Sequence, residues 1–197
     1  MIITIGRQYG SGGREIGKKL AEKLGYAYYD TEILEHAARS SGLSKEILSR
    51  YDECLTDNWL NLSVGMNGGA DINKLPVPIR AEIAQFEAIR EIGKKGSAVI
   101  VGRCADYVLR EQDNVFSVFI YAGMEQRISR VAKRNGISVE EAKKRIKNTD
   151  KKRMAYYNYY TDKSWGKNGN YHVCLDSGFL GTDHAVVMLE ACINVMS

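Results

Sequence analysis

Three observations predict one α/β domain, spanning residues 1–197 and built on a parallel β-sheet. The chain is 44% hydrophobic and 26% charged, a composition typical of a globular domain with a buried core. Its apolar residues gather in short runs that lie far apart along the chain, as in strands buried on both faces. A helical pattern joins the first two runs, and so short a crossover connects parallel strands.

The first unit of the domain is a strand, a glycine-rich loop, a helix and a second strand within residues 2–29. We expect strands at Ile2–Ile5 and Tyr26–Tyr29, because both runs are apolar or aromatic. Between them, Arg14–Leu24 has an apolar residue at every fourth position, which predicts a helix with one buried face. Gly25 follows directly and is expected to end that helix.

The rest of the chain repeats this order around two insertions. Residues 32–95 are predicted to be largely helical, and residues 135–170 are basic and rich in tyrosine. Insertions over a parallel sheet commonly form lids. The stretch 57–78 contains both prolines and three glycines without a period, so we expect a long loop there. The remaining predicted elements are helices at Ile79–Lys95, Met124–Arg134, Val139–Tyr160 and Thr182–Val195, and strands at Ala98–Val101, Val115–Tyr121 and His172–Leu175.

The net charge of +4 is concentrated in one segment. Residues 124–153 hold eleven Lys or Arg and four Asp or Glu, a net of +7, so the rest of the chain carries −3. This balance does not indicate a dedicated nucleic-acid-binding protein, and the basic segment has no signature of an RNA-binding module. We therefore expect no nucleic-acid partner and expect the basic segment to bind phosphate groups.

The four cysteines lie far apart, with no CxxC pair and no histidine at ligand spacing. Neither a disulfide framework nor a zinc site is indicated by that distribution. The chain opens without the pattern of a signal peptide, and we expect no apolar run long enough to span a bilayer. A cytoplasmic protein without a membrane partner is the expectation.

The densest cluster of glycines lies between the first predicted strand and the first predicted helix. Glycine lets consecutive backbone N–H groups turn inward around an anion, and the following helix adds its positive N-terminus. We expect a phosphate-binding loop here; the alternative is a closely packed turn without a ligand. The candidate cofactor-binding residues of this loop are Arg7, Gly10, Ser11, Gly12, Gly13, Arg14 and Glu15. Ser11 and Glu15 are also candidates for helping to hold a metal.

This loop departs from the P-loop pattern GxxxxGK[ST]. When residues 10–12 are laid on the final GxG of the pattern, Gly13 falls on the lysine. Arg14 then falls on the hydroxyl residue that binds Mg²⁺. Arg14 is a candidate for the missing cation and Arg7 is a second, because a guanidinium presents a planar fork to phosphate oxygens.

Residues 2–34 resemble the start of bacterial cytidylate kinases, and more closely the divergent cytidylate kinase-like branch of the P-loop kinases. The likeness covers nearly the whole chain in order. It implies a three-layer P-loop kinase fold with a five-stranded parallel sheet, an acceptor-binding insertion at 32–95 and a basic lid at 124–170. The four later segments that carry the likeness are Val99–Arg103, Ala122–Arg130, Ile146–Arg153 and Leu175–Ser177.

The resemblance also implies a reaction, the transfer of the γ-phosphoryl group of ATP to a nucleoside monophosphate, CMP or dCMP, with Mg²⁺. Nucleotides are the implied partners, and Arg103 is implied to contact the acceptor nucleotide. Two positions depart from the family: Gly13 replaces the loop lysine, and His36 stands where an acceptor-site arginine is expected. Two alternatives stay open, a nucleotide-binding protein without kinase activity and a kinase for another small acceptor.

Phosphoryl transfer requires in-line positioning and cations around the moving charge. Arg127, Arg130 and Arg134 share one face of their predicted helix and are expected to close over the triphosphate. The alternative is a solvated basic stripe. The candidate catalytic residues are Arg14, Arg103, Arg127 and Arg130; the candidate substrate-binding residues are Asp30, Arg103, Arg130, Arg134 and Arg153; and Arg127 is also a candidate for binding ATP.

Three of these candidates have alternatives of their own. Arg103 follows a predicted buried strand, which places it at the sheet edge where ligands bind, or it is a surface arginine paired with Asp106. Asp30 either orients Mg²⁺ through water, holds an arginine or caps the next helix. Arg153 either completes the lid or forms an ordinary ion pair with Asp150.

Overall fold

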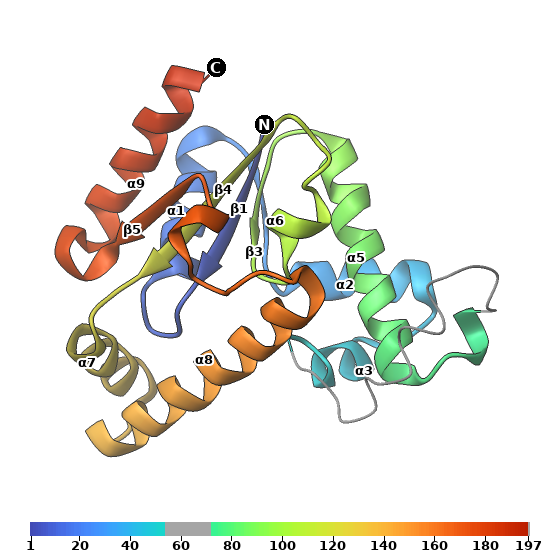
Figure 1. Ribbon diagram of the computed structural model, residues 1–197, viewed down its shortest axis with the longest axis horizontal. Helices are drawn as coiled ribbons and strands as arrows, with labels where there is room; N and C mark the ends of the chain where they lie inside the picture. Colours follow the sequence, from blue (N-terminus) through green and yellow to red (C-terminus); the bar gives the residue numbers. More distant parts are fainter. Residues whose placement is uncertain (54–71, 197) are drawn as a thin grey trace.

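The computed structural model describes residues 1–53 and 72–196 and contains a five-stranded parallel sheet between two layers of helices (Figure 1). The strand order is β2-β3-β1-β4-β5, and every neighbouring pair is parallel. The predicted three-layer α/β fold is therefore confirmed. The strands are β1 (Ile2–Arg7), β2 (Ala27–Tyr29), β3 (Ala98–Val101), β4 (Val115–Tyr121) and β5 (Val173–Asp176).

Helices bury apolar residues on both faces of this sheet. One face packs against α1 (Gly13–Leu24) and α9 (Ser177–Met196), which share one apolar cluster with β1 and β4. The opposite face packs against a second apolar cluster, to which several helices contribute (Figure 1). These helices are α2 (Glu32–Ser41), α3 (Lys45–Arg50), α5 (Val77–Lys95) and α6 (Ala105–Val108).

Two further helices lie at the edge of the sheet where its strands end (Figure 1). They are α7 (Met124–Asn135) and α8 (Val139–Thr161), and they pack together through Val131 and Ile146. Ser138 caps the start of α8, and its hydroxyl accepts a hydrogen bond from Glu141 N at 3.2 Å. The basic segment predicted from the charge distribution is thus held beside the C-terminal ends of the strands.

A few boundaries differ from the prediction. The last helix begins at Ser177, but Gly181 has φ 75° and ψ 169°, so regular helix resumes at the predicted Thr182. Most of the predicted loop 57–78 lies outside the described residues, as does Cys54; within it, Ile72–Lys74 forms a 3₁₀ turn and Val77 already belongs to α5.

By length and composition, α9 is the one helix of the described chain that could cross a membrane. The helix reaches this length with polar residues such as Asp183 and Glu190 included, whereas the sequence-based expectation concerned an uninterrupted apolar run. One side of α9 is buried in the core, through Ala185, Val186, Leu189 and Ile193. That side belongs to the α/β domain.

Candidate active site

The glycine loop connects β1 to α1 at the C-terminal edge of the sheet. Gly10 and Gly12 both have φ of 83°, in the left-handed region that favours glycine. A side chain at Gly12 would also meet Thr182 Cγ2 at 2.9 Å. Because α1 begins directly after Gly12, the N–H groups of its first turn open toward the loop. The loop therefore has the backbone conformation of a phosphate cradle.

Two serines hold this loop in shape. The Ser11 hydroxyl is buried, donates to Gln8 O at 2.9 Å and accepts from Gly13 N at 3.4 Å. Ser177, from the start of α9, places its hydroxyl between Ser11 O and Tyr121 O. The Ser11 side chain, a candidate metal ligand, is thus engaged within the loop itself.

Two arginines of α7 lie against the loop. Arg127 is 5% exposed, and its Nη1 lies 2.5 Å from Asp150 Oδ2. The other oxygen of Asp150 accepts from Tyr9 N at 2.7 Å, so this ion pair ties α8 to the loop as well. Arg130 donates from Nη1 to Gly10 O at 2.8 Å. Both side chains are therefore positioned to meet a phosphate bound at the loop.

Arg134 and Arg153, the other two basic candidates of this region, differ in their exposure and contacts. Arg134 is exposed, with its guanidinium 5.3 Å from the centre of the Tyr9 ring, so a solvated stripe describes this residue alone. Arg153 of α8 donates from Nη1 to Arg7 O at 3.2 Å and from Nε to Glu53 at 3.1 Å. Because Asp150 pairs with Arg127, the ordinary ion pair proposed for Arg153 is replaced by contacts inside the site.

Asp30, directly after β2, holds two arginines. It is 4% exposed, and its Oδ2 accepts a short hydrogen bond from Arg14 Nε. Its Oδ1 lies 3.4 Å from Arg103 Nη1. Of the three interpretations of Asp30, holding an arginine is the one that the contacts support. Arg14 consequently turns toward the end of β2.

Arg103 is the largest fully buried side chain of the described chain. It donates two parallel hydrogen bonds to Asp52, from Nε at 2.7 Å and from Nη2 at 2.6 Å. Arg103 and Cys104 both adopt left-handed backbone conformations, with φ of 54° and 52°. Asp106 instead accepts a hydrogen bond from Tyr157 at 2.7 Å. The alternative of a surface arginine paired with Asp106 is therefore wrong.

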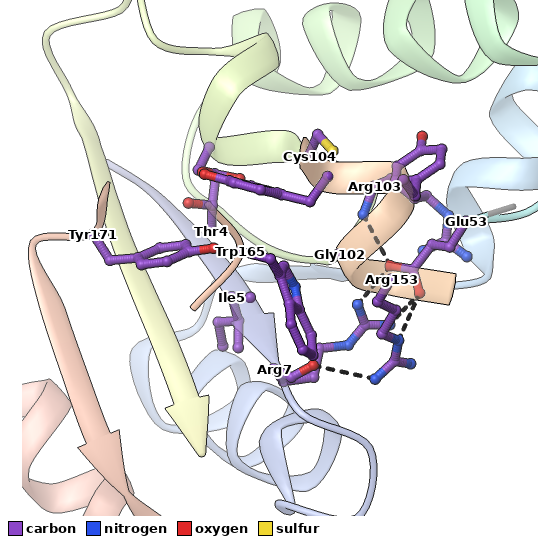
Figure 2. Close-up of a pocket in the computed structure, with 14 residues that line it drawn as sticks. Thr4, Ile5, Arg7, Glu53, Gly102, Arg103, Cys104, Arg153, Trp165 and Tyr171 are labelled. Atoms are coloured by element: carbon purple, nitrogen blue, oxygen red, sulfur yellow. Dashed lines mark hydrogen bonds and ion pairs between the residues drawn. The ribbon is translucent and has the colours of Figure 1, made fainter. Parts of the chain in front are cut away.

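Glu53 lies at the centre of the arginine cluster (Figure 2). Its Oε1 is 2.5 Å from Arg7 Nη1 and 3.1 Å from the backbone N of Arg103, and its Oε2 is 3.1 Å from Arg153 Nε. Gly102 makes room for this carboxylate, because a Cβ there would meet Glu53 Oε1 at 2.1 Å. We call the donors around Glu53, namely the Arg7 and Arg153 guanidinium groups and the Arg103 N–H, the anion cradle.

The anion cradle holds Glu53 in its charged form. Burial alone would raise the pKa of Glu53, but the positive charges of Arg7, Arg153 and Arg103 outweigh it and hold this pKa far below its usual range. The space left among these side chains is about 20 Å³, room for about one water molecule. With the side chains as they lie in this structure, the Glu53 carboxylate fills the cradle and leaves no room for a phosphate group beside it.

Residues 52 and 53 were not found by sequence reasoning, and neither was Glu82. Two acidic neighbours before a long loop have no spacing that marks a site. Glu82, on α5, accepts a hydrogen bond from Tyr156 inside the protein, and burial raises its pKa to about 8. The sequence does contain a signal for Arg7, the partner of Glu53. The alignment that puts Gly13 on the lysine also puts Arg7 on the first glycine of GxxxxGK[ST].

The donor atoms near the loop do not form a Mg²⁺ site of their own. Both oxygens of Asp30 face guanidinium groups, and Glu15 pairs with Lys19 at 2.7 Å and accepts from Thr182 at 2.9 Å. In the part of the chain that the structure describes, no three His, Cys, Asp or Glu residues are grouped to hold a metal. Kinase sites commonly hold Mg²⁺ through substrate phosphates with one or two carboxylates. The residues present do not fit a protein-held ion.

Known proteins resemble this chain over most of its length. It is 28% identical to a cytidylate kinase of Methanopyrus kandleri over 203 aligned residues, covering 98% of this chain and 93% of the relative. A solved structure of an uncharacterized protein from Eubacterium ventriosum matches with a TM-score of 0.72 and 31% identity, covering 98% of both chains. A shikimate kinase from Bacteroides thetaiotaomicron matches with a TM-score of 0.56 and 13% identity, covering 98% of both chains, and shares the fold.

A family model also matches most of the chain. The sequence profile of the cytidylate kinase-like family matches residues 2–178, which include the glycine loop, the arginines of the anion cradle and both α7 and α8. The chain belongs to the cytidylate kinase-like family.

Proposed function

We propose that the protein transfers the γ-phosphoryl group of ATP to a nucleoside monophosphate, with CMP or dCMP as the acceptor. The observation that carries this proposal is the anion cradle, in which arginines from three parts of the chain converge on one buried carboxylate beside the glycine loop. Converging cations suit a group whose negative charge shifts during transfer. Membership of the cytidylate kinase-like family supports a nucleotide substrate.

ATP is proposed to bind at the glycine loop. The loop backbone around Gly10 and Gly12 and the first turn of α1 would hold its phosphates. Arg127 and Arg130 approach the same loop from α7 and would neutralise the triphosphate. Arg134 lies farther out, over Tyr9, where it would add to the positive field.

The acceptor phosphate is proposed to bind between the anion cradle and the end of β2. Arg103 presents two parallel N–H groups there, now bound to Asp52, and this fork matches the oxygens of a phosphate. Arg153 faces the same space from α8. Arg14, held by Asp30, lies beside these groups and would orient the transferred phosphoryl group.

Mg²⁺ is proposed to enter the site with ATP, bound by the phosphates and by water. When bound, it would neutralise charge on the phosphoryl oxygens. The arginines supply the fixed positive charges of the protein, and they do so without losing hydration at the moment of reaction.

A second candidate, nucleotide binding without turnover, is favoured by one observation. Gly13 occupies the lysine position of the loop, so the loop itself lacks the cation that usually reaches the transferred phosphoryl group. The proposed kinase requires another residue to supply that charge.

A cytoplasmic location is proposed as well. The cysteines of the described chain, Cys104, Cys174 and Cys192, are free thiols, which suits a reducing compartment.

One assay tests the proposed activity. Purified protein is incubated with ATP, Mg²⁺ and each of CMP, dCMP, UMP, AMP, GMP and shikimate, and ADP is measured for each acceptor. We expect ADP to form fastest with CMP or dCMP. ATP binding measured by calorimetry, without ADP formation from any acceptor, would instead establish the non-catalytic alternative. Turnover with a different acceptor alone would replace CMP in the proposal.

A further inference from the structure

The side chain of Arg7 covers the position from which a loop lysine would start. A Cβ built on Gly13 would lie 2.6 Å from Arg7 Cβ and 3.1 Å from Arg7 Cγ, closer than such atoms pack. The backbone of Gly13 is not in the left-handed region, so its conformation alone would accept a side chain. The stem of Arg7 is therefore what excludes lysine at residue 13.

The two departures from the P-loop pattern are thus coupled. Arg7 stands where the pattern has its first glycine, and Gly13 stands where it has lysine. Each glycine leaves room for the long cationic side chain at the other position. The loop has kept one small and one basic residue, with the positions exchanged.

The guanidinium of Arg7 lies in a site that holds an anion, the Glu53 carboxylate. Its guanidinium runs past Gly102, where a Cβ would meet Arg7 Nη1 at 2.3 Å, and ends on the Glu53 carboxylate with contacts of 2.5 and 3.2 Å (Figure 2). Arg153 and the N–H of Arg103 donate to the same carboxylate. Three donor groups converging on two oxygens in a buried position are the surroundings that a phosphoryl group requires.

We propose that Arg7 and Gly13 are an exchanged pair, in which Arg7 supplies from the end of β1 the phosphate-binding cation that other P-loops supply from the lysine. Glu53 occupies the anion cradle until a phosphate takes its place. This inference rests on the proposed function for the identity of the phosphate, which is the terminal phosphate of ATP. Its geometry rests on the contacts of Arg7 with Gly13, Gly102 and Glu53 and on the other donors of the anion cradle.

A double-mutant cycle tests the exchange through binding, independently of turnover. The variants are Arg7→Gly, Gly13→Lys and the double variant Arg7→Gly/Gly13→Lys, and the measurement is the Kd for ATP and for inorganic pyrophosphate by titration calorimetry. Each single variant is expected to bind about 10- to 100-fold more weakly, the loss of charge-assisted hydrogen bonds. The double variant regains affinity to within about threefold of wild type, because the lysine then has both space and target.

A loss in the double variant equal to the product of the two single losses would overturn the exchange. So would a wild-type protein that binds neither ATP nor pyrophosphate. If ATP binds and follows the cycle but no acceptor yields ADP, the proposed function fails while the exchange stands.

Conservative variants keep the test decisive if the glycine variants do not fold. Arg7→Met retains the stem over Gly13 and removes the charge, so it should lose about tenfold or more in ATP affinity, whereas Arg7→Lys keeps the charge without the two-pronged contact and should lose less than Arg7→Met. Arg110→Met is the matched control, because Arg110 is exposed and contacts Tyr107 and Glu111. Equal ATP affinity in Arg7→Met and wild type would overturn the proposal.

Discussion

Arg103 binds Asp52 through two parallel hydrogen bonds, and the Asp52 carboxylate lies where the proposal places an acceptor phosphate. Burial raises the pKa of Asp52 although Arg103 opposes the shift, so this carboxylate is more easily neutralised than an ordinary one. The pair therefore combines an arginine that is always charged with a carboxylate that, in the proposal, an acceptor phosphate replaces.

The first prediction concerns this fork. Arg103→Lys keeps a positive charge but loses the bidentate geometry, so kcat/KM for CMP should fall by about 10- to 100-fold, or about 1.4–2.7 kcal/mol. The Kd for ATP should change by less than about threefold, because Arg103 lies on the side of Asp30 and Asp52. Steady-state kinetics and calorimetry separate the two effects. Equal losses for CMP and ATP would remove Arg103 from the acceptor site.

The second prediction compares two arginines near the glycine loop. Arg14 points to Asp30, whereas Arg130 contacts the loop carbonyl of Gly10. Arg130→Ala should therefore weaken ATP binding by about tenfold, and Arg14→Ala by less than about threefold. Calorimetry with ATP measures both values. A larger loss in Arg14→Ala would make Arg14 the replacement for the lysine and would count against Arg7.

The third prediction concerns the occupant of the anion cradle. Glu53→Gln removes the negative charge that phosphate must displace, so the Kd for ATP should decrease severalfold. The same change leaves Arg7 and Arg153 without their buried counter-charge, and losing one partner of such a pair typically costs about 3–5 kcal/mol of stability. Calorimetry and chemical denaturation give the two values. The control is Glu46→Gln, because Glu46 is an exposed residue of α3, and weaker ATP binding in Glu53→Gln would show that the carboxylate assists the ligand.

The fourth prediction is a pH dependence of stability. Burial raises the pKa of Glu82 from its ordinary 4.5 to about 8, so the folded chain holds this proton more tightly than the unfolded chain. The resulting stability is fully present below pH 4.5 and is lost as the pH rises toward 8. Over this range it falls by up to about 1.4 kcal/mol per pH unit.

Glu82→Gln isolates this contribution. The amide keeps an acceptor for Tyr156 and does not titrate, so the unfolding free energy of the variant relative to wild type should increase from pH 5 to pH 8. Denaturant unfolding at several pH values gives the difference. Glu87→Gln, on the exposed side of the same helix, should leave the difference flat. A flat difference for Glu82→Gln as well would mean that Glu82 is ionised in the folded protein.

The parts of the site that lie close together in the sequence were predictable. β1, the glycine loop and α1 follow one another within residues 2–24, so apolar runs and glycines marked each of them. Arg103 was predictable for a related reason, because only Gly102 separates it from the end of a wholly buried strand. Local pattern and strand order are enough to place such residues at the C-terminal edge of a parallel sheet.

The carboxylates of the site were not predictable, because their partners are far away along the chain. Glu53 meets Arg7 across 46 residues and Arg153 across 100. Nothing in the local sequence around Glu53 is apolar or periodic in a way that indicates burial. The position of Glu53 is set by ion pairs with residues distant in the sequence. A single sequence has no regular spacing that identifies such pairs.

The backbone at Arg103 and Cys104 bears on how the site works. Two consecutive left-handed residues other than glycine each cost on the order of 1–3 kcal/mol and persist because the surrounding fold holds them. This conformation aims the Arg103 N–H at the anion cradle. The turn is therefore preorganised, since the energy needed to shape it is spent when the chain folds. On the proposed exchange, an arriving phosphate would replace one anion by another and leave the peptide geometry as it was.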